Sequence, residues 1–118
     1  MAKIISYDKE NDILVIHNGF SANEKFKGNI DAGDLILDIS TEGRVRGIEV
    51  LNAMSFFKEF EIGRKALENL LEAKFNAVVK PTSIVIAIMI KGKDMQEMPA
   101  KIAVPIEVPV RRKSAKGL

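Results

Sequence analysis

The alternation of apolar and polar side chains along this chain constrains its fold more than any other feature. Leu35, Leu37 and Ile39 share one parity, whereas Asp38 and Ser40 share the other. Side chains of a strand alternate between its two faces, so this pattern predicts a strand with one buried face and one wet face. β-branched content predicts further strands over residues 3–7, 13–16, 44–51, 77–80, 84–90 and 102–110. We therefore expect a mainly antiparallel sheet of six or seven strands.

Local irregularities refine this picture. Val45 lies on one parity, whereas Ile48 and Val50 lie on the other, and Gly47 stands between them. A β-bulge at Gly47 would bring all three apolar side chains to one core. The bulge would present to solvent the side chains of Arg44, Arg46 and Glu49. Before the strand at Leu35, we expect a polar loop that runs from Asn18 through Gly28, and we expect residues 102–110, with Pro105 and Pro109, to form an edge strand.

One segment has helical spacing instead. Apolar residues recur there at steps of three and four, namely Phe56, Phe57, Phe60, Ala66, Leu67, Leu70 and Leu71. This is the stripe of an amphipathic helix, so we predict one helical segment over about residues 55–73 and an α+β fold. Ser55 is the expected N-cap, and Gly63 is expected to interrupt or divide the helix.

The length of 118 residues predicts a single domain over 1–118. We expect residues 1–53 to form a β meander, residues 54–110 to add the helix and two or three further strands, and residues 111–118 to form a disordered basic tail. Hydrophobic residues make up 47% of the chain and charged residues 29%, which is typical of a globular protein.

The chain has no cysteine, which excludes disulfides, thiolate metal sites and cysteine nucleophiles. Its longest apolar run, from Ile84 to Ile90, is far shorter than the roughly 18 residues that a membrane span needs. Asp8 interrupts the N-terminal segment before an apolar run typical of a signal peptide can form. We expect a soluble, cytoplasmic protein that does not bind a membrane.

A family resemblance extends over residues 3–53. It is carried by Tyr7-Asp8, by Asp12-Ile13-Leu14-Val15-Ile16, by Asp34-Leu35-Ile36-Leu37-Asp38 and by Gly43-Arg44-Val45-Arg46-Gly47-Ile48-Glu49-Val50-Leu51-Asn52-Ala53. These segments resemble the small family called domain of unknown function 2283. The resemblance implies a compact β meander of bacterial and archaeal origin. It implies no activity, cofactor or catalytic residue, and about 65 residues follow the resembling part.

The sequence offers two candidate metal or catalytic sites, one at the single histidine and one at a set of acidic residues. His17 is the only histidine, and with no cysteine it cannot assemble a zinc or copper site alone, so we expect a structural or surface role. Asp31, Asp34, Asp38 and Glu49 could gather to hold a divalent ion for a metal-assisted hydrolase. The alternative is a solvated surface on which Arg44 and Arg46 neutralise Asp38 and Glu49, and we favour it. We therefore expect no catalytic residue, no metal ligand and no cofactor.

The basic tail offers a different class of function. Four of the 18 Lys and Arg residues lie in it, so the rest of the chain is slightly acidic: Arg111, Arg112, Lys113 and Lys116. These side chains could bind phosphates, as in a nucleic-acid-associated accessory or antitoxin-like protein. The segment has no interleaved aromatic residue for base stacking, so a solubilising tail is the alternative that we favour.

A cluster of phenylalanines is the last candidate. Phe56, Phe57 and Phe60 either anchor the helix to the sheet or form a partner interface. Residues 84–90 are apolar on both faces and predict a central strand that needs cover on both sides, whereas one helix covers only one side of a sheet. We therefore expect a homodimer and, as its function, a non-catalytic binding or assembly module.

Overall fold

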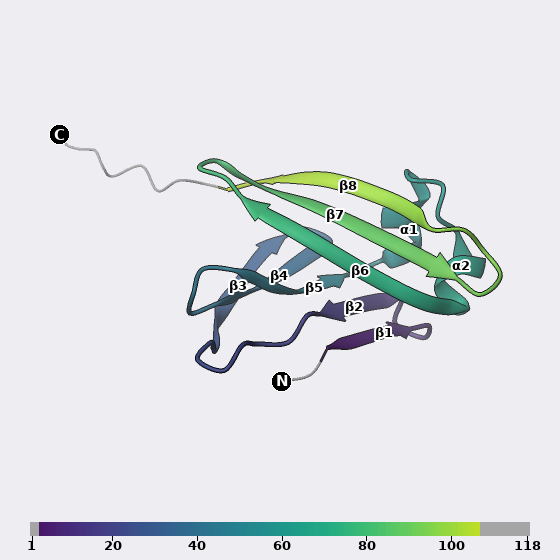
Figure 1. Cartoon of the computed structure of the whole chain (residues 1–118). Helices are drawn as coiled ribbons and strands as arrows, with labels where there is room; N and C mark the ends of the chain where they lie inside the picture. The colour runs from purple at the N-terminus through teal and green to yellow at the C-terminus, as the bar shows by residue number, and fades with distance from the viewer. Residues whose placement is uncertain (1–2, 107–118) are drawn as a thin grey trace.

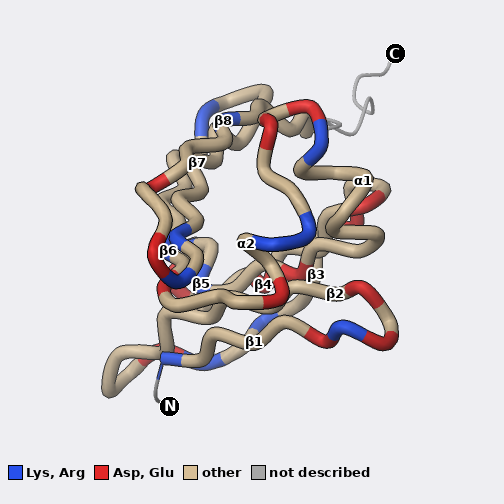
Figure 2. Tube along the Cα trace, turned by 90° about the vertical axis from the view of Figure 1, so that its right-hand side faces the viewer, with Lys and Arg blue, Asp and Glu red and all other residues tan. Residues whose placement is uncertain are grey.

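The computed structural model describes residues 3–106, which form two antiparallel sheets over one apolar core (Figure 1). The first sheet has the strand order β1-β2-β5-β4-β3, with β1 Ile4–Asp8, β2 Ile13–His17, β3 Phe26–Ala32, β4 Leu35–Ser40 and β5 Val45–Val50. The second has the order β6-β7-β8, with β6 Leu70–Val79, β7 Ser83–Gly92 and β8 Met98–Pro105. The helices α1 (Ala53–Lys58) and α2 (Arg64–Glu68) lie between β5 and β6 in the chain. Figure 2 shows α2 at one end of the molecule, between the two sheets.

The predicted α+β fold with antiparallel pairing is confirmed, but the single sheet of six or seven strands is wrong. The described residues form a five-stranded and a three-stranded sheet. The reason lies in the helical segment, which carries the chain out of the first sheet after β5. β6 then pairs with β7, and the apolar faces of both sheets turn toward the same core.

The predicted helix over residues 55–73 is also wrong in its extent. It is two short helices, and Leu70 and Leu71 already belong to β6. The expected division at Gly63 is confirmed, because Gly63 has extended backbone geometry (φ −105°, ψ −173°) and directly precedes α2. Asn52, not Ser55, is the N-cap of α1, and its side chain makes no capping hydrogen bond.

Strand boundaries differ from the prediction at three further places. The expected polar loop through Gly28 contains the start of β3. This strand lies at the sheet edge and is mostly polar and exposed, so it shows little of the alternation of apolar and polar residues that would predict a strand. β6 begins at Leu70 rather than at Ala77. The last strand runs from Met98 to Pro105 and is an edge strand, as expected, whereas residues 107–110 of the predicted strand lie outside the described part of the chain.

The predicted bulge at Gly47 is confirmed. Asp38 pairs with Gly47, and the next residue, Ile39, pairs with Val45, so Arg46 has no residue opposite it in β4. The shift in register brings both parities of β5 to the core: Val45, Ile48 and Val50 are all buried.

The predicted central strand is β7, which lies between β6 and β8. Its inward side chains are almost fully buried: Ile84, Ile86, Ile88 and Ile90. Its other face is not covered by any described element, since Val85 and Met89 are only partly buried and Ala87 is exposed. Within residues 3–106 only one face of this strand is covered, and the homodimer that we expected to cover the other face stays a prediction. Within the same residues, neither helix is long and apolar enough to cross a membrane.

Candidate functional site

The loop between β2 and β3, residues 18–25, places a carboxylate in a buried position. The side chain of Glu24 has no solvent exposure. Arg44 donates from Nη2 to Oε1 at 2.7 Å and from Nε to Oε2 at 2.9 Å, and the Ser40 hydroxyl donates to Oε2. The hydrogen bonds from Arg44 and Ser40 outweigh desolvation and hold the pKa of Glu24 far below its usual range. Both carboxylate oxygens of Glu24 thus have hydrogen-bond donors, and the ionised side chain has a structural role in this loop.

A second arginine fastens the same loop. Arg46 donates from Nε to the carbonyl oxygen of Gly19 at 2.8 Å and from Nη2 to that of Asn18 at 3.3 Å. Its Nε also lies 3.5 Å from Oε1 of Glu24. The expectation that Arg44 and Arg46 neutralise Asp38 and Glu49 from a solvated surface is therefore corrected, because both arginines pair with Glu24.

Glu24 was not among the residues that the sequence analysis selected. A signal for it exists in the spacing Ser21-x-x-Glu24, which resembles a capping box. The backbone N–H of Ser21 donates to Oε1 of Glu24 at 3.1 Å, and the N–H of Glu24 donates to the carbonyl oxygen of Ser21 at 3.1 Å. The spacing therefore predicts the local turn, but it does not predict that Arg44 and Arg46 pair with Glu24.

His17 is buried at the edge of this loop. Its Nδ1 accepts a hydrogen bond from the backbone N–H of Gly19 at 2.8 Å, and its ring meets Phe20 edge-on with centroids 4.9 Å apart. Because Nδ1 is an acceptor, Nε2 carries the proton of the neutral ring, and it lies 3.9 Å from Oδ2 of Asp38. These contacts support the structural role that we expected for His17.

The four carboxylates considered for a metal site lie apart. Asp31 lies near the end of β3, where it accepts a hydrogen bond from the N–H of Gly33, and Asp34 lies in the turn between β3 and β4. Asp38 and Glu49 lie on the outer face of the first sheet, with Glu49 opposite Ile36. Within residues 3–106, no group of three His, Asp or Glu side chains has the arrangement needed to hold a metal ion.

The phenylalanine cluster packs mainly inward. Phe57 has no solvent exposure, while Phe56 and Phe60 are partly buried against the core. The Phe56 ring is 5.0 Å from Phe57 and 5.9 Å from Phe60, measured between centroids. An interface role for this cluster stays a prediction. So does nucleic-acid contact by the tail, because Arg111, Arg112, Lys113 and Lys116 lie outside the described residues.

A polar contact that the sequence analysis missed joins the β1–β2 turn to α1. The Asp12 carboxylate accepts a hydrogen bond from the Tyr7 hydroxyl at 2.6 Å and one from the N–H of Met54 at 3.1 Å. The Asp12 carbonyl oxygen accepts the N–H of Ala53 at 3.0 Å. Asp12 thereby supplies the cap that Asn52 does not provide. Burial and the hydrogen bond to Asp12 raise the pKa of Tyr7.

The edges of the two sheets differ in how they resist strand addition. In the described part of the chain, the edge strands are β1, β3, β6 and β8. β8 carries Pro99 and Pro105, which cannot donate backbone hydrogen bonds. β1 is only five residues long, and β3 has a register shift between Phe26 and Gly28. Short strands, prolines and bulges are the features by which proteins block sheet edges.

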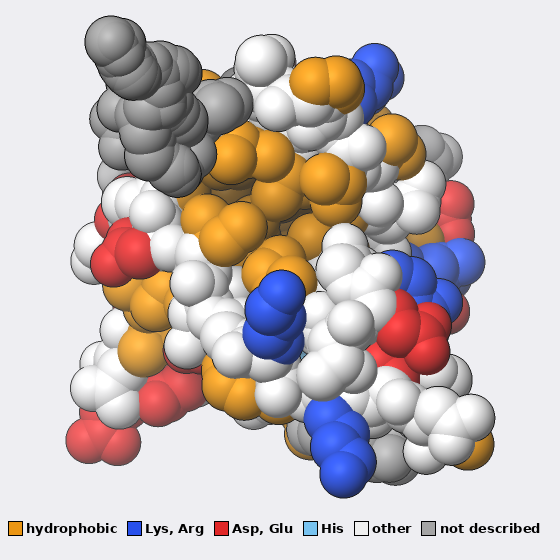
Figure 3. All heavy atoms as spheres, turned by 90° about the vertical axis from the view of Figure 1, so that its left-hand side faces the viewer, with side chains coloured by type: hydrophobic (Ala, Val, Ile, Leu, Met, Phe, Trp, Pro, Cys, Tyr) orange, Lys and Arg blue, Asp and Glu red, His pale blue; other side chains and the backbone are white. Residues whose placement is uncertain are grey.

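β6 lacks these protections over its second half. The strand is ten residues long, contains no proline and ends in the uncharged segment Phe75–Val79. Val78 and Val79 are 48% and 52% exposed. A hollow of about 450 Å³ lies along this segment, with Asn18 and residues 43–46 on its other side. Figure 3 shows apolar side chains gathered around a hollow at the end of the molecule where β6 ends in Figure 1.

Comparison with known proteins agrees with the resemblance in the N-terminal part. The family model described as protein of unknown function (DUF2283) matches residues 4–53. The uncharacterized protein MJ0789 of Methanocaldococcus jannaschii is 37% identical over 89 residues, which cover 74% of this chain and 69% of that protein. No solved structure matches the chain.

A second relative has a name that refers to an activity. The protein of Methanosarcina mazei named "Putative hypoxanthine phosphoribosyltransferase" is 31% identical over 64 residues, which cover 54% of this chain. The match spans only 47% of that relative, so its name is not carried over to this chain. The chain belongs to the DUF2283 family of proteins of unknown function.

Proposed function

We propose that this protein is a non-catalytic assembly module that forms a homodimer by pairing β6 with β6 of a second copy. The observation that carries the proposal is the unblocked edge at Phe75–Val79, with two half-exposed valines at its end. Unpaired strand edges of this kind are templates for pairing with another chain. The absence of cysteine is consistent with action in the cytoplasm.

The sequence of the edge supports a symmetric partner. An antiparallel pair with its two-fold axis at Ala77 places Val79 opposite Phe75 of the second copy and Val78 opposite Asn76 of the second copy. All five residues of the pair, 75–79, are uncharged. In the same register Lys74 lies opposite Lys80 of the second copy, so the uncharged pair ends at these two lysines. Phe75, Ala77 and Val79 share one face of β6, so the pair keeps the inward face of each copy inward.

Two contributions favour the pairing: backbone hydrogen bonds and burial of apolar side chains. It would satisfy outward backbone groups of β6, which make no backbone hydrogen bond to the first sheet among the described residues. Covering the exposed half of each valine contributes roughly 1 kcal/mol per side chain. Two three-stranded sheets would then become one continuous sheet across the dimer.

The mass of the purified protein in solution tests the proposal. Size-exclusion chromatography with light scattering should give twice the chain mass of 13.1 kDa at micromolar concentration. The variants Val78→Lys and Val79→Lys should be monomeric, because each places a charge in the pair. Leu71→Lys is the matched control: Leu71 is 63% exposed on the same strand but lies outside the paired segment, so this variant should remain dimeric.

Two outcomes would contradict the proposal. The first is a wild-type protein that stays monomeric up to the highest soluble concentration. The second is a dimer that survives both valine substitutions, which would move the interface elsewhere. In that case Phe56→Ala and Phe60→Ala would test the partly buried phenylalanines as the interface.

A further inference from the structure

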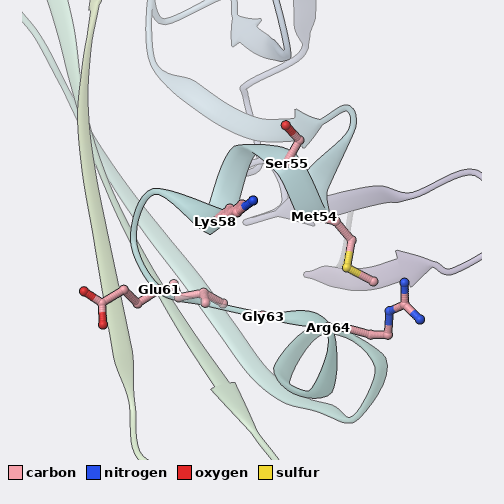
Figure 4. A pocket seen from close by; sticks show the side chains of 7 residues that line it. Met54, Ser55, Lys58, Glu61, Gly63 and Arg64 are labelled. Atoms are coloured by element: carbon pink, nitrogen blue, oxygen red, sulfur yellow. The ribbon is translucent and has the colours of Figure 1, made fainter.

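A hollow between α1 and α2 lies away from the β6 edge and has the size of a small-molecule site. Its volume is about 650 Å³, within the range of roughly 300–1,000 Å³ that is usual for ligand pockets. Figure 4 shows its lining residues: Met54, Ser55, Lys58, Glu61, Ile62, Gly63 and Arg64. In Figure 1 the two helices lie at the opposite end of the molecule from the end of β6.

The wall of this hollow is apolar. Met54 is partly buried and extends from α1 toward α2 in Figure 4, whereas Ile62 is fully buried in the core beneath the hollow. At Gly63 the chain carries no side chain, and a Cβ there would meet no atom within 4 Å. The hollow therefore has an apolar wall with free space above Gly63.

The rim is positively charged. Lys58 forms no ion pair with any residue in 3–106, and the side chain of Arg64 is 72% exposed, with its Nε 3.7 Å from Glu68. Glu61 also belongs to the lining, but Figure 4 shows its carboxylate pointing away from Lys58 and Arg64. The side of the hollow near Met54 thus presents two cations and no facing carboxylate from the lining.

We propose that this hollow binds a small ligand that has an apolar body and one anionic group. The anionic group lies between Lys58 and Arg64, where it forms charge-assisted hydrogen bonds. The apolar body lies on Met54, in the space above Gly63. Both parts of the ligand are needed, because a single exposed ion pair contributes little affinity by itself.

An NMR titration with three probes tests the site on the full chain. Sodium octanoate and octyl phosphate have the predicted chemistry with different anionic groups, whereas octylammonium has the same apolar body with the opposite charge. Both anions should shift amide signals of residues 53–68 in a saturable way below their micelle concentrations. Octylammonium should bind about tenfold more weakly or not at all.

Three variants locate the binding. Lys58→Glu reverses an exposed charge and should weaken octanoate binding about tenfold. Gly63→Val fills the free space and suits the extended backbone at this position, so it should abolish binding with the fold retained. Lys101→Glu is the matched control, since Lys101 is exposed on β8 and is not part of the lining.

The outcomes that would overturn the ligand site differ from those that would overturn the dimer. Equal binding of octylammonium, unchanged affinity in both Lys58→Glu and Gly63→Val, or no saturable shift with either anion would each overturn the ligand site. The dimer proposal rests on β6 alone, so Val78→Lys should become monomeric and still bind octanoate.

Discussion

The imidazole ring of His17 lies against Gly47 where any other residue would carry its side chain. A Cβ at position 47 would come within 2.5 Å of Cδ2 of His17 and 3.0 Å of Oδ2 of Asp38. Gly47 pairs with His17 on β2 and with Asp38 on β4, so the three residues form one row across the first sheet. Glycine at this position leaves room for the histidine ring, which also contacts Phe20 edge-on.

Gly47→Ala should therefore lower the free energy of unfolding by about 1–3 kcal/mol, because the ring and the new methyl group cannot occupy the same space. Urea unfolding followed by circular dichroism measures the effect. Gly28→Ala is the matched control, since a Cβ on this strand glycine would meet nothing within 4 Å. Adding His17→Ala to Gly47→Ala should cost less than the sum of the two single changes. Additive losses would show that the ring does not occupy the space.

The ion pair between buried Glu24 and half-exposed Arg44 predicts a loss of stability in acid. The pKa of Glu24 is held well below its ordinary value of 4.5 by the Arg44 and Ser40 hydrogen bonds, so the unfolded chain takes up this proton first as the pH falls. The pair therefore stabilises the fold above about pH 5, and its contribution is lost as the pH falls toward the folded-state pKa.

Glu24→Gln isolates this contribution, because Asp8 also has a lowered pKa and acts in the same direction in both proteins. The melting temperature of wild type should exceed that of Glu24→Gln at pH 7, and the difference should shrink between about pH 5 and pH 3. A difference that stays constant with pH would contradict the ion pair.

Tyr7 predicts the opposite behaviour in alkali. Its pKa is raised above the ordinary 10.0 by burial and by the hydrogen bond to Asp12, so folding favours the protonated phenol. This contribution is fully present below pH 10 and is lost as the pH rises toward the folded-state pKa. Tyr7 is the one tyrosine and the chain has no tryptophan, so absorbance of the tyrosinate reports this side chain alone.

The titration midpoint of Tyr7 in the folded protein should lie above that in urea, and Asp12→Asn should lower it toward 10.0. The same substitution should destabilise the fold by about 1–2 kcal/mol, since Asp12 also accepts the N–H of Met54 at the start of α1. Equal midpoints in the folded and unfolded chains would mean that the Tyr7–Asp12 hydrogen bond is not formed.

Features set by neighbours in the sequence were predictable. The turn at Gly43, the antiparallel pairing of β4 with β5 and the bulge at Gly47 follow from parity and glycine placement. The central place of β7 follows from its unbroken apolar run. Each of these depends on a few adjacent residues, which periodicity can describe.

Features that depend on distant segments were not predictable. Glu24 meets Arg44 across 20 residues, and Asp12 meets Met54 across 42. The periodicity of a single sequence describes neighbouring residues and does not show which distant residues meet. Leu70 and Leu71 continue the helical spacing of α2, yet they begin β6, because pairing with β7 outweighs local preference.

The last prediction concerns Gly92, at the end of β7, where α2 packs directly on the strand. A Cβ at this position would lie 2.9 Å from the Cα of Ala66 in α2 and 2.8 Å from Sδ of Met95. The methionine end can move aside, whereas the helix backbone cannot do so without shifting α2 as a whole. Gly92→Ala should therefore destabilise the fold by about 1–3 kcal/mol in urea unfolding. Met95→Ala in the same background should recover little of this loss, because the helix contact remains. Full recovery would instead assign the conflict to the methionine and leave α2 free to adjust.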